Sequence, residues 1–406
     1  MDVKGAYPNG KLKEEIFMMQ PKGYSNGTSQ LCWLIKTLYG LKQSGCEWNE
    51  ELDTKLKGIN FEQLLSDACV YIQKTKSGVE IITVWMDNLL VFTNSKELMH
   101  DLKAELKGLF DITDLGEPSK LIRIEITQDR ANKSITIKQE RYIKSILEKE
   151  GLDKANPVST PLDPNVKLEP QDQGDDQEIP KQYGNYASLM GSIMYVACST
   201  RPNIAYTTNT LCGFTANPSM AHWSATKRLL RYLKGTKDVS ITYEASEKDK
   251  NKLYVYSDAN FANKANSISV TGYATILNGA AIMWCSQRQK VVALLTTEAE
   301  YMAMASASRE IMWLRNLLKE LGYTQREATT LYSDNQSAIA IAYNPQYHKR
   351  SKHFRMKDNH IREKVWRKKI KIEYCQMTNM VTDALTKALP QPKHTQHMDS
   401  LGLTTA

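Results

Sequence analysis

The sequence predicts a mixed fold of the α/β and α+β classes, divided over more than one folded region. Three features indicate it: β-rich apolar runs in residues 79–93, a helix-rich stretch over 183–236, and strands separated by helices from about Lys252 onward. Strands that alternate with helices after an initial meander are typical of α/β layer folds. The 406 residues, 41% of them hydrophobic and 24% charged, suffice for two or three cores.

The first region combines a hairpin with an amphipathic helix. Residues 79–93 form two apolar runs around a polar turn that would carry Asp87. The segment 96–110 has helical periodicity, and its apolar face would consist of Leu98, Leu102, Leu106 and Leu109. Two strand-like segments, LIRIEIT and SITIKQ, follow. We therefore expect a first domain over residues 1–150.

A change in composition separates this domain from the rest. Residues 151–182 are rich in Pro, Asp, Gln and Gly, which bury little surface and predict a solvated linker. Residues 183–250 read as a helical region, whose last helix should end at Gly235. A third domain is expected over 251–390, with a long helix from Thr297 between its strands, and a tail over 391–406.

Charge and cysteine content restrict the class of protein. Lys and Arg exceed Asp and Glu by 53 to 45, a net charge of +8 that mildly favours a polyanionic partner. The seven cysteines are scattered and lack the paired spacings of zinc sites, which indicates reduced thiols in an intracellular protein. No apolar run approaches the roughly 18 residues that a membrane span needs, so we expect no membrane association.

Four carboxylates stand at strand ends and helix starts. Asp258 and Asp334 close strands, Glu300 lies in the first turns of a helix, and Asp383 lies near the start of a short one. Two divalent cations about 3.5–4 Å apart need several such oxygen ligands around them. Taken singly, each carboxylate is better explained as a residue that ends a strand or caps a helix, and only their order and context favour a metal site.

The order and context of these residues resemble a known family. Three segments carry the likeness: VYSDANFANKANSISVTGYATILNGAAIMWCSQRQKVVALLTTEAEYMAMASASREIMWLRNLLKELGY and the later LYSDNQSAIAIAYN and VTDALTKALP. They resemble the RNase H domain of copia-type LTR retrotransposons. The resemblance implies a catalytic Asp-Glu-Asp-Asp site that binds two Mg²⁺ or Mn²⁺ ions. That site transfers to Asp258, Glu300, Asp334 and Asp383.

The glutamate of this set has a rival in Glu298. We prefer Glu300 because in related helices the ligand is followed three and seven positions later by small residues, here Ala303 and Ala307.

One departure weakens the match. The family usually continues the first strand as Asp-Ala-Asp-Trp-Ala, whereas this chain has Asn260 and Phe261 in the third and fourth of those positions. The four ligands are unaffected by this loss of an acid.

The amino-terminal half resembles a reverse transcriptase of the same family. The opening MDVKGAYPNGKLKEEIFMMQPKGY and the later LIKTLYGLKQSGCEW match its first blocks. Asp2 and Asp87 match the first aspartates of the two metal-binding motifs, but Asn88 replaces the second aspartate of the hairpin, and an amide is a poorer ligand for hard cations. Because the match begins at Asp2, the fingers region would be absent, so we expect a truncated, inactive palm.

A basic segment follows the third carboxylate. Phosphate binding is the functional interpretation and a solvated helix face the alternative. The candidate nucleic-acid-binding residues are Lys349, Arg350, Lys352, Arg355, Arg362, Arg367 and Lys368. A second basic cluster, on the last helix of the middle region, consists of Lys227, Arg228, Arg231 and Lys234.

Taken together, the resemblance implies a fragment of a copia-type Pol polyprotein: a partial palm over 1–150, a helical thumb or connection region over 183–250, and an RNase H-like mixed-sheet domain over 251–390. The implied function is hydrolysis of RNA in RNA–DNA hybrids, in a cytoplasmic particle or the nucleus, with a complete polymerase subunit as a conceivable partner. The alternative is a catalytically inert, degenerate or host-retained nucleic-acid-binding protein.

Overall fold

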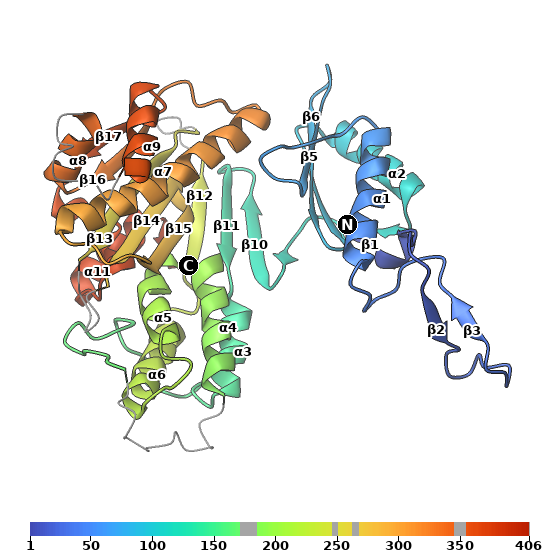
Figure 1. The fold of residues 1–406 in the computed structure, drawn as a ribbon, viewed down its shortest axis with the longest axis horizontal. Helices are drawn as coiled ribbons and strands as arrows, with labels where there is room; N and C mark the ends of the chain where they lie inside the picture. Colours follow the sequence, from blue (N-terminus) through green and yellow to red (C-terminus); the bar gives the residue numbers. More distant parts are fainter. Residues whose placement is uncertain (171–184, 246–250, 262–267, 345–354, 406) are drawn as a thin grey trace. The chain divides into compact units, whose positions relative to one another are not determined.

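The computed structural model describes residues 1–170, 185–245, 251–261, 268–344 and 355–405 (Figure 1). The chain divides into two units. The first consists of residues 1–118 together with 316–322, and the second of 119–315 together with 323–406. In the described residues, no helix is long and apolar enough to cross a bilayer.

The first unit contains a six-stranded sheet. Its order is β4 (Glu62–Gln63), β5 (Val70–Lys74), β6 (Val79–Trp85), β7 (Asn88–Thr93), β1 (Asp2–Val3) and β8 (Ile112–Thr113). The predicted hairpin corresponds to β6 and β7. The helices are α1 (Ser44–Gly58) and α2 (Lys96–Leu109), and α2 begins where the Ser95 side chain accepts a hydrogen bond from Leu98 N. Leu52, Leu102 and Leu106 are buried in the core against Ile82.

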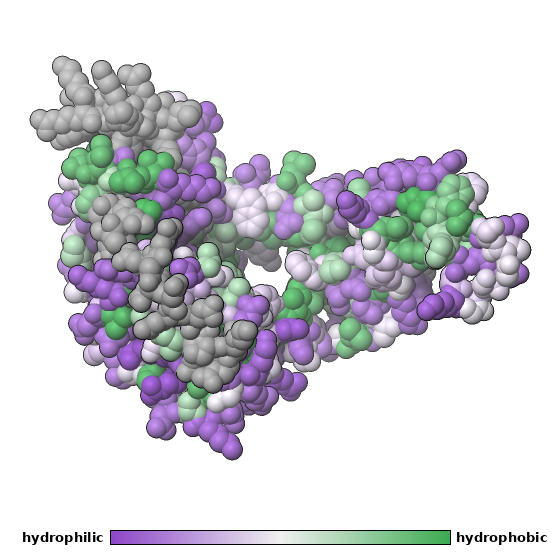
Figure 2. All heavy atoms as spheres, turned by 60° about the horizontal axis from the view of Figure 1, so that its bottom comes forward, coloured by the Kyte–Doolittle hydropathy of each residue, from purple (hydrophilic) through white to green (hydrophobic). Residues whose placement is uncertain are grey.

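A two-stranded hairpin also belongs to the first unit. It is formed by β2 (Phe17–Met19) and β3 (Leu31–Trp33), after the short 3₁₀ turn η1 (Tyr7–Asn9). Phe17, Met19 and Trp33 are exposed on it, which is unusual for side chains of this size. Figure 2 shows a face on which hydrophilic residues cover much of the surface and apolar residues gather in several patches.

The second unit begins with a five-stranded sheet that joins distant parts of the chain. Its order is β18 (Leu403–Thr404), β12 (Ser240–Glu244), β11 (Ser134–Lys138), β10 (Ile124–Asp129) and β9 (Lys120–Leu121). The last residues were expected to form a tail. Instead, they contain α11 (Gln391–Ser400) and β18, and Leu401 and Leu403 are buried in one apolar cluster with Ile241 of β12.

Helices pack beside this sheet. They are α3 (Glu140–Lys149), α4 (Tyr186–Ser199), the 3₁₀ turn η3 (Pro202–Ile204), α5 (Ala205–Cys212) and α6 (Met220–Gly235), and they share one apolar core. The predicted stop at Gly235 coincides with the end of α6. Ser219 caps its start by accepting a hydrogen bond from the backbone of His222.

The predicted linker is wrong in its described part. Residues 151–170 run along the helical core, and Leu162 is only 5% exposed within it. The second basic cluster explains this path. Arg228, Arg231 and Lys234 donate hydrogen bonds to Thr160 Oγ1 (2.9 Å), Asn156 O (2.6 Å) and Ala155 O (2.7 Å). These three cations hold the segment against α6. Residues 171–182 lie outside the described residues.

A second five-stranded sheet carries the predicted carboxylates. Its order is β15 (Ala280–Arg288), β14 (Val270–Leu277), β13 (Tyr254–Asn260), β16 (Thr329–Ser333) and β17 (Ile370–Tyr374). The first three strands are antiparallel, and β16 and β17 continue parallel to β13. This arrangement is the RNase H-like mixed sheet that the sequence predicts.

Helices cover one face of this sheet (Figure 1). They are α7 (Thr296–Glu320), α8 (Gln336–Tyr343) and α9 (Arg355–Trp366), packed on Val255, Leu331 and Ile372. On the other face, β12, β18 and the short α10 (Asp383–Thr386) pack on Ala274 and Ile276.

The helical region and this sheet belong to one unit, although we expected separate domains over 183–250 and 251–390. Polar contacts hold the helical region together and link it to α11 and to β15. The fully buried Arg201 donates hydrogen bonds to both oxygens of Thr236, and the hydroxyl of Tyr232 on α6 lies 2.9 Å from the imidazole Nε2 of His394 on α11. Trp284 of β15 also donates to Ala197 O of α4 at 2.8 Å.

Candidate metal centre and nucleic-acid interface

Three of the four predicted carboxylates meet at one edge of the mixed sheet. Asp258 lies on β13, Asp334 directly follows β16, and Glu300 lies near the start of α7. One oxygen from each lies within 4.8 Å of the others. The parallel register pairs Tyr256 with Tyr332, so the two aspartates, each two residues further along, come side by side. Asp258 does not end its strand as expected, because β13 continues to Asn260 and Asp258 is still paired with Gly272 of β14. The paired Val255 and Leu331 are buried together under the helices, and the rings of Tyr256 and Tyr332 stack, which holds β13 and β16 in this register.

Neighbouring groups fix the orientation of this cluster. The Thr386 hydroxyl donates a hydrogen bond to Asp258, and the backbone N–H of Ala259 donates one to Glu300 Oε2 at 3.1 Å. Asn260, which replaces an acid of the family pattern, donates from its side chain to Thr386 O at 3.0 Å. Asn260 therefore links β13 to α10 through this hydrogen bond.

The close approach of α10 requires a glycine on β14. A Cβ atom at Gly272 would lie 2.6 Å from Thr386 Cγ2, closer than packed atoms come. The absence of a side chain on Gly272 is what lets Thr386 reach Asp258.

Burial raises the pKa values of these acids. Asp258 and Glu300 are 3% and 4% exposed. Loss of hydration raises the pKa of Asp258 to about 6, against the opposing effects of Lys387 and the Thr386 hydroxyl. Burial, followed by the charges of Asp258 and Asp334, raises the pKa of Glu300 to about 10. The pKa of Asp334 is also raised, first by burial and then by the charge of Asp383. Such a concentration of buried acids is suited to binding cations.

The fourth acid is positioned differently. Asp383, also buried, is paired through Oδ1 with Lys387 Nζ at 2.6 Å and through Oδ2 with Lys393 Nζ. It is close enough for its charge to raise the pKa values of Asp258 and Asp334. Asp383 therefore stands beside the three-carboxylate group with both oxygens occupied by ammonium groups.

The two candidate glutamates on α7 point to different partners. Glu298 accepts a hydrogen bond from Leu294 N at 2.6 Å, as an acid near a helix start commonly does. Glu300 belongs to the carboxylate group instead. The choice of Glu300 as the ligand stays a prediction, which the variants described below test.

Sequence reasoning missed three residues of the centre: Thr386, Lys387 and Lys393. A signal was present in TDALTKAL, because Lys387 follows Asp383 by four residues, the spacing of a helical ion pair. Lys393 and Thr386 gave no comparable signal, since their interactions depend on how α10 and α11 pack.

In the first unit, the polymerase-type residues are adjacent. Asp2 on β1 lies opposite Asn88 on β7, and Val3 N donates to Asp87 O at 2.8 Å. The amide of Asn88 donates to Asp87 Oδ1, also at 2.8 Å. The neutral amide of Asn88 thus gives the Asp87 carboxylate a hydrogen bond, whereas an aspartate at position 88 would repel that carboxylate.

The basic segment is described only in part. Lys349, Arg350 and Lys352 lie outside the described residues, as does the side chain of Arg355. Arg362 donates from Nε to Ile341 O at 3.0 Å and so ties α9 to α8. Arg367 and Lys368 are exposed beyond the end of α9, next to the exposed Trp366, and Arg367 pairs with Glu363 at 2.9 Å.

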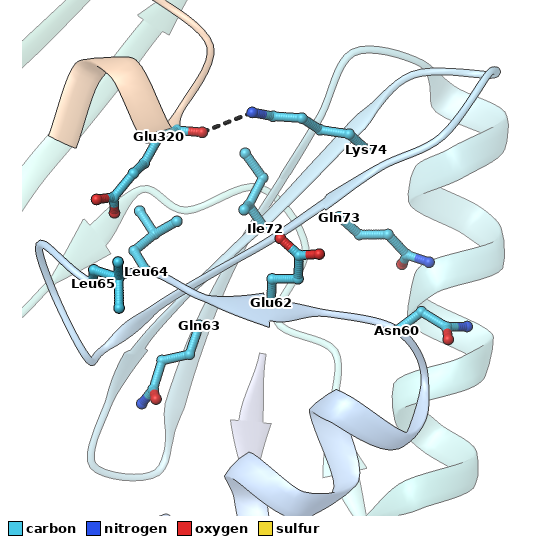
Figure 3. Close-up of a pocket in the computed structure, with 9 residues that line it drawn as sticks. All are labelled: Asn60, Glu62, Gln63, Leu64, Leu65, Ile72, Gln73, Lys74 and Glu320. Atoms are coloured by element: carbon cyan, nitrogen blue, oxygen red, sulfur yellow. Dashed lines mark hydrogen bonds between the residues drawn. The ribbon is translucent and has the colours of Figure 1, made fainter. Parts of the chain in front are cut away.

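A separate pocket of about 500 Å³ lies in the first unit (Figure 3). Lys74 Nζ donates to the Glu320 backbone oxygen at 2.7 Å on its rim, and the Glu320 carboxylate accepts hydrogen bonds from Ser66 N and Oγ. None of the predicted site residues lines this pocket.

Fold and site define a class of protein: a Pol-type chain in which a polymerase region precedes an RNase H-like sheet. Comparisons agree with this class. Residues 1–164 match the family described as reverse transcriptase (RNA-dependent DNA polymerase). The chain is 36% identical over 404 residues to the Retrovirus-related Pol polyprotein from transposon TNT 1-94 of Nicotiana tabacum, covering 97% of this chain and 30% of that protein. It is 31% identical over 315 residues to a putative transposon Ty5-1 protein of Saccharomyces cerevisiae, covering 77% of this chain and 100% of that protein.

The chain therefore belongs to the copia-type retrotransposon Pol family. It spans less than a third of the length of the TNT 1-94 polyprotein. Among solved structures, the foamy viral protease-reverse transcriptase in complex with RNA/DNA hybrid matches 93% of this chain and 43% of its own at 11% identity and a TM-score of 0.49. This likeness is slight, and the assignment does not rest on it.

Proposed function

We propose that the second unit hydrolyses the RNA strand of RNA–DNA hybrids with two bound Mg²⁺ or Mn²⁺ ions. The observation that carries this proposal is the convergence of Asp258, Glu300 and Asp334 within 4.8 Å. The donor set fits the metals, because it consists of carboxylate oxygens, which hard divalent cations prefer. Asp383 would complete the set after releasing a lysine. When bound, the ions would activate water and offset the charge that develops on the phosphodiester.

The protein's own residues supply orientation. The Thr386 hydroxyl donates to Asp258 and the Ala259 N–H donates to Glu300, so both carboxylates are held in fixed orientations. Preorganised ligands need little rearrangement during the reaction, which favours catalysis.

The direct test uses purified protein, a hybrid labelled in its RNA strand, and Mg²⁺ or Mn²⁺ with and without chelator. We expect cleavage of the RNA strand that requires metal and that single-stranded RNA and duplex DNA do not show. A protein that folds, binds Mn²⁺ and leaves the hybrid intact would instead support the alternative, a catalytically inert binding protein. The loss of acids at Asn88 and Asn260 is the observation in favour of that alternative.

We also propose that the basic end of α9 binds the nucleic-acid backbone. Arg362 is unsuited to a charge-reversal test because it ties α9 to α8. Reversing Arg367, Lys368 and Lys369, all exposed, should weaken binding. It should also reduce the slope of log K against log salt by about 0.9 for each phosphate of duplex DNA that the variant no longer neutralises.

The matched control is a variant in which the charges of three exposed lysines elsewhere are reversed: Lys96, Lys107 and Lys149. It makes the same change in net charge. Equal losses of affinity and slope in the two triple variants would show a general charge effect and remove the interface proposal. Fluorescence anisotropy over a salt series measures both quantities.

We infer that the polymerase half does not carry out templated DNA synthesis. Its metal site would have Asp2 and Asp87 but an amide at Asn88, which already donates to Asp87. Primer-extension assays with this chain should stay at the background set by heat-inactivated protein. Extension above that level would overturn the inference. A complete polymerase subunit as partner, and a location in a cytoplasmic particle or the nucleus, are proposals compatible with it.

A further inference from the structure

A lysine lies among the acids of the metal centre. Lys387 Nζ is 2.6 Å from Asp383 Oδ1. Its positive charge opposes the rise that burial causes in the pKa values of Asp258 and Asp334. Burial alone would lower the pKa of Lys387, but the charges of Asp258, Asp383 and Asp334 raise it. The Lys387 ammonium thus pairs directly with Asp383, and its charge acts on the other two aspartates of the proposed metal centre.

The position of this lysine is set by the fold. It directly follows Thr386, whose hydroxyl donates to Asp258 and whose backbone oxygen accepts from the Asn260 side chain. The close packing of Thr386 on Gly272 fixes the end of α10 against the sheet. The backbone at Lys387 therefore has little freedom, and its side chain starts beside the cluster.

We propose that Lys387 is the counter-cation of the carboxylate cluster in the metal-free protein, and that a divalent ion binds only after the Lys387 ammonium moves away from the aspartates. A buried acid is neutralised either by a proton, as for Glu300, or by a nearby cation, so the acids that stay ionised need a cation beside them in both states. Two cations cannot share the same few oxygens without repulsion. The lysine side chain is 40% exposed, which gives its ammonium a path to water.

Lys393 provides a contrast on the same acid. It pairs with the other oxygen of Asp383, from α11, and its charge lowers the pKa of Asp334. The charges that act most strongly on Asp258 include Lys387 and do not include Lys393. Both lysines therefore pair with Asp383, but only Lys387 is among the charges that act most strongly on Asp258.

The experiment compares Lys387→Met with Lys387→Arg and Lys393→Met in the full chain. Mn²⁺ affinity is measured by electron paramagnetic resonance of free Mn²⁺ and by the rise of Tm with Mn²⁺ concentration. Removal of one screened charge should tighten Mn²⁺ binding of Lys387→Met by about tenfold and lower its Tm in chelator. Lys387→Arg should stay near wild type, and Lys393→Met should change affinity by less than about threefold.

Unchanged or weaker Mn²⁺ binding by Lys387→Met would overturn the inference, as would equal effects of the two methionine variants. If Lys387→Met folds only when Mn²⁺ is present, the inference is supported, because the metal has then replaced the missing charge. The inference rests on the proposed function for the metal site alone. Proteins that follow this affinity pattern but leave a hybrid uncut would refute hydrolysis and keep the role of Lys387.

Discussion

Replacement of Asp258 or Asp334 by Asn is expected to lower hydrolysis of the RNA strand by about a thousandfold or more. Both side chains lie in the three-carboxylate group, and an amide of the same size removes a negative charge that the two cations need. Asp258 is the more central of the two, since it also accepts the Thr386 hydrogen bond and is almost fully buried. Single-turnover cleavage of a labelled hybrid at saturating Mg²⁺ measures the loss.

Binding of the hybrid provides the control for this prediction. Loss of a negative charge reduces repulsion of phosphate, so the Asn variants should bind the hybrid as well as wild type or more tightly. Glu300→Gln should be as inactive as they are, whereas Glu298→Gln should remain active, because Glu298 bonds to the backbone before α7. An active Glu300→Gln, or an inactive Glu298→Gln with normal Tm, would reverse the assignment of the glutamate.

The elements that sequence reasoning placed well have strong local patterns. The hairpin of β6 and β7 follows from two apolar runs around a polar turn, and α2 from leucines at helical spacing, of which Leu102 and Leu106 are buried. The carboxylates of the mixed sheet were singled out by their expected places at strand ends and helix starts and by the order that the family resemblance supplies. Asp258 and Asp334 meet in the structure, and Glu300 reaches them from α7.

The parts that were missed depend on interactions between residues distant in sequence. Residues 151–170 have a linker composition, yet Arg231 and Lys234 of α6 donate hydrogen bonds to their backbone. Hydrogen bonds to carbonyl oxygens leave no trace in the identity of the residues that accept them. The carboxyl-terminal strand β18 is two residues long, and it forms because β12 offers it an unpaired edge. The salt bridges that occupy Asp383 likewise depend on the packing of α10 and α11.

The second large effect concerns the pH dependence of stability without metal. The pKa of Glu300 is raised to about 10 in the folded protein, chiefly by burial, from an ordinary value of 4.5. The folded state therefore binds this proton more tightly than the unfolded state. Between these two values the free energy of unfolding should fall as pH rises, by up to about 1.4 kcal/mol per pH unit for one proton. Asp258, with a pKa raised to about 6, acts in the same direction at the acidic end.

Urea unfolding in chelator from pH 5 to pH 9 measures this slope. Glu300→Gln should flatten it, since glutamine keeps the shape of the protonated acid but has no proton to lose, whereas Glu298→Gln should keep the wild-type slope. Saturating Mn²⁺ should also flatten it for wild type, because the metal replaces the proton on the carboxylate, and proton release on binding should be measurable by titration in weak buffer. A metal-free protein that gains stability over this range, or a Glu300→Gln variant with the wild-type slope, would show that Glu300 does not hold the proton.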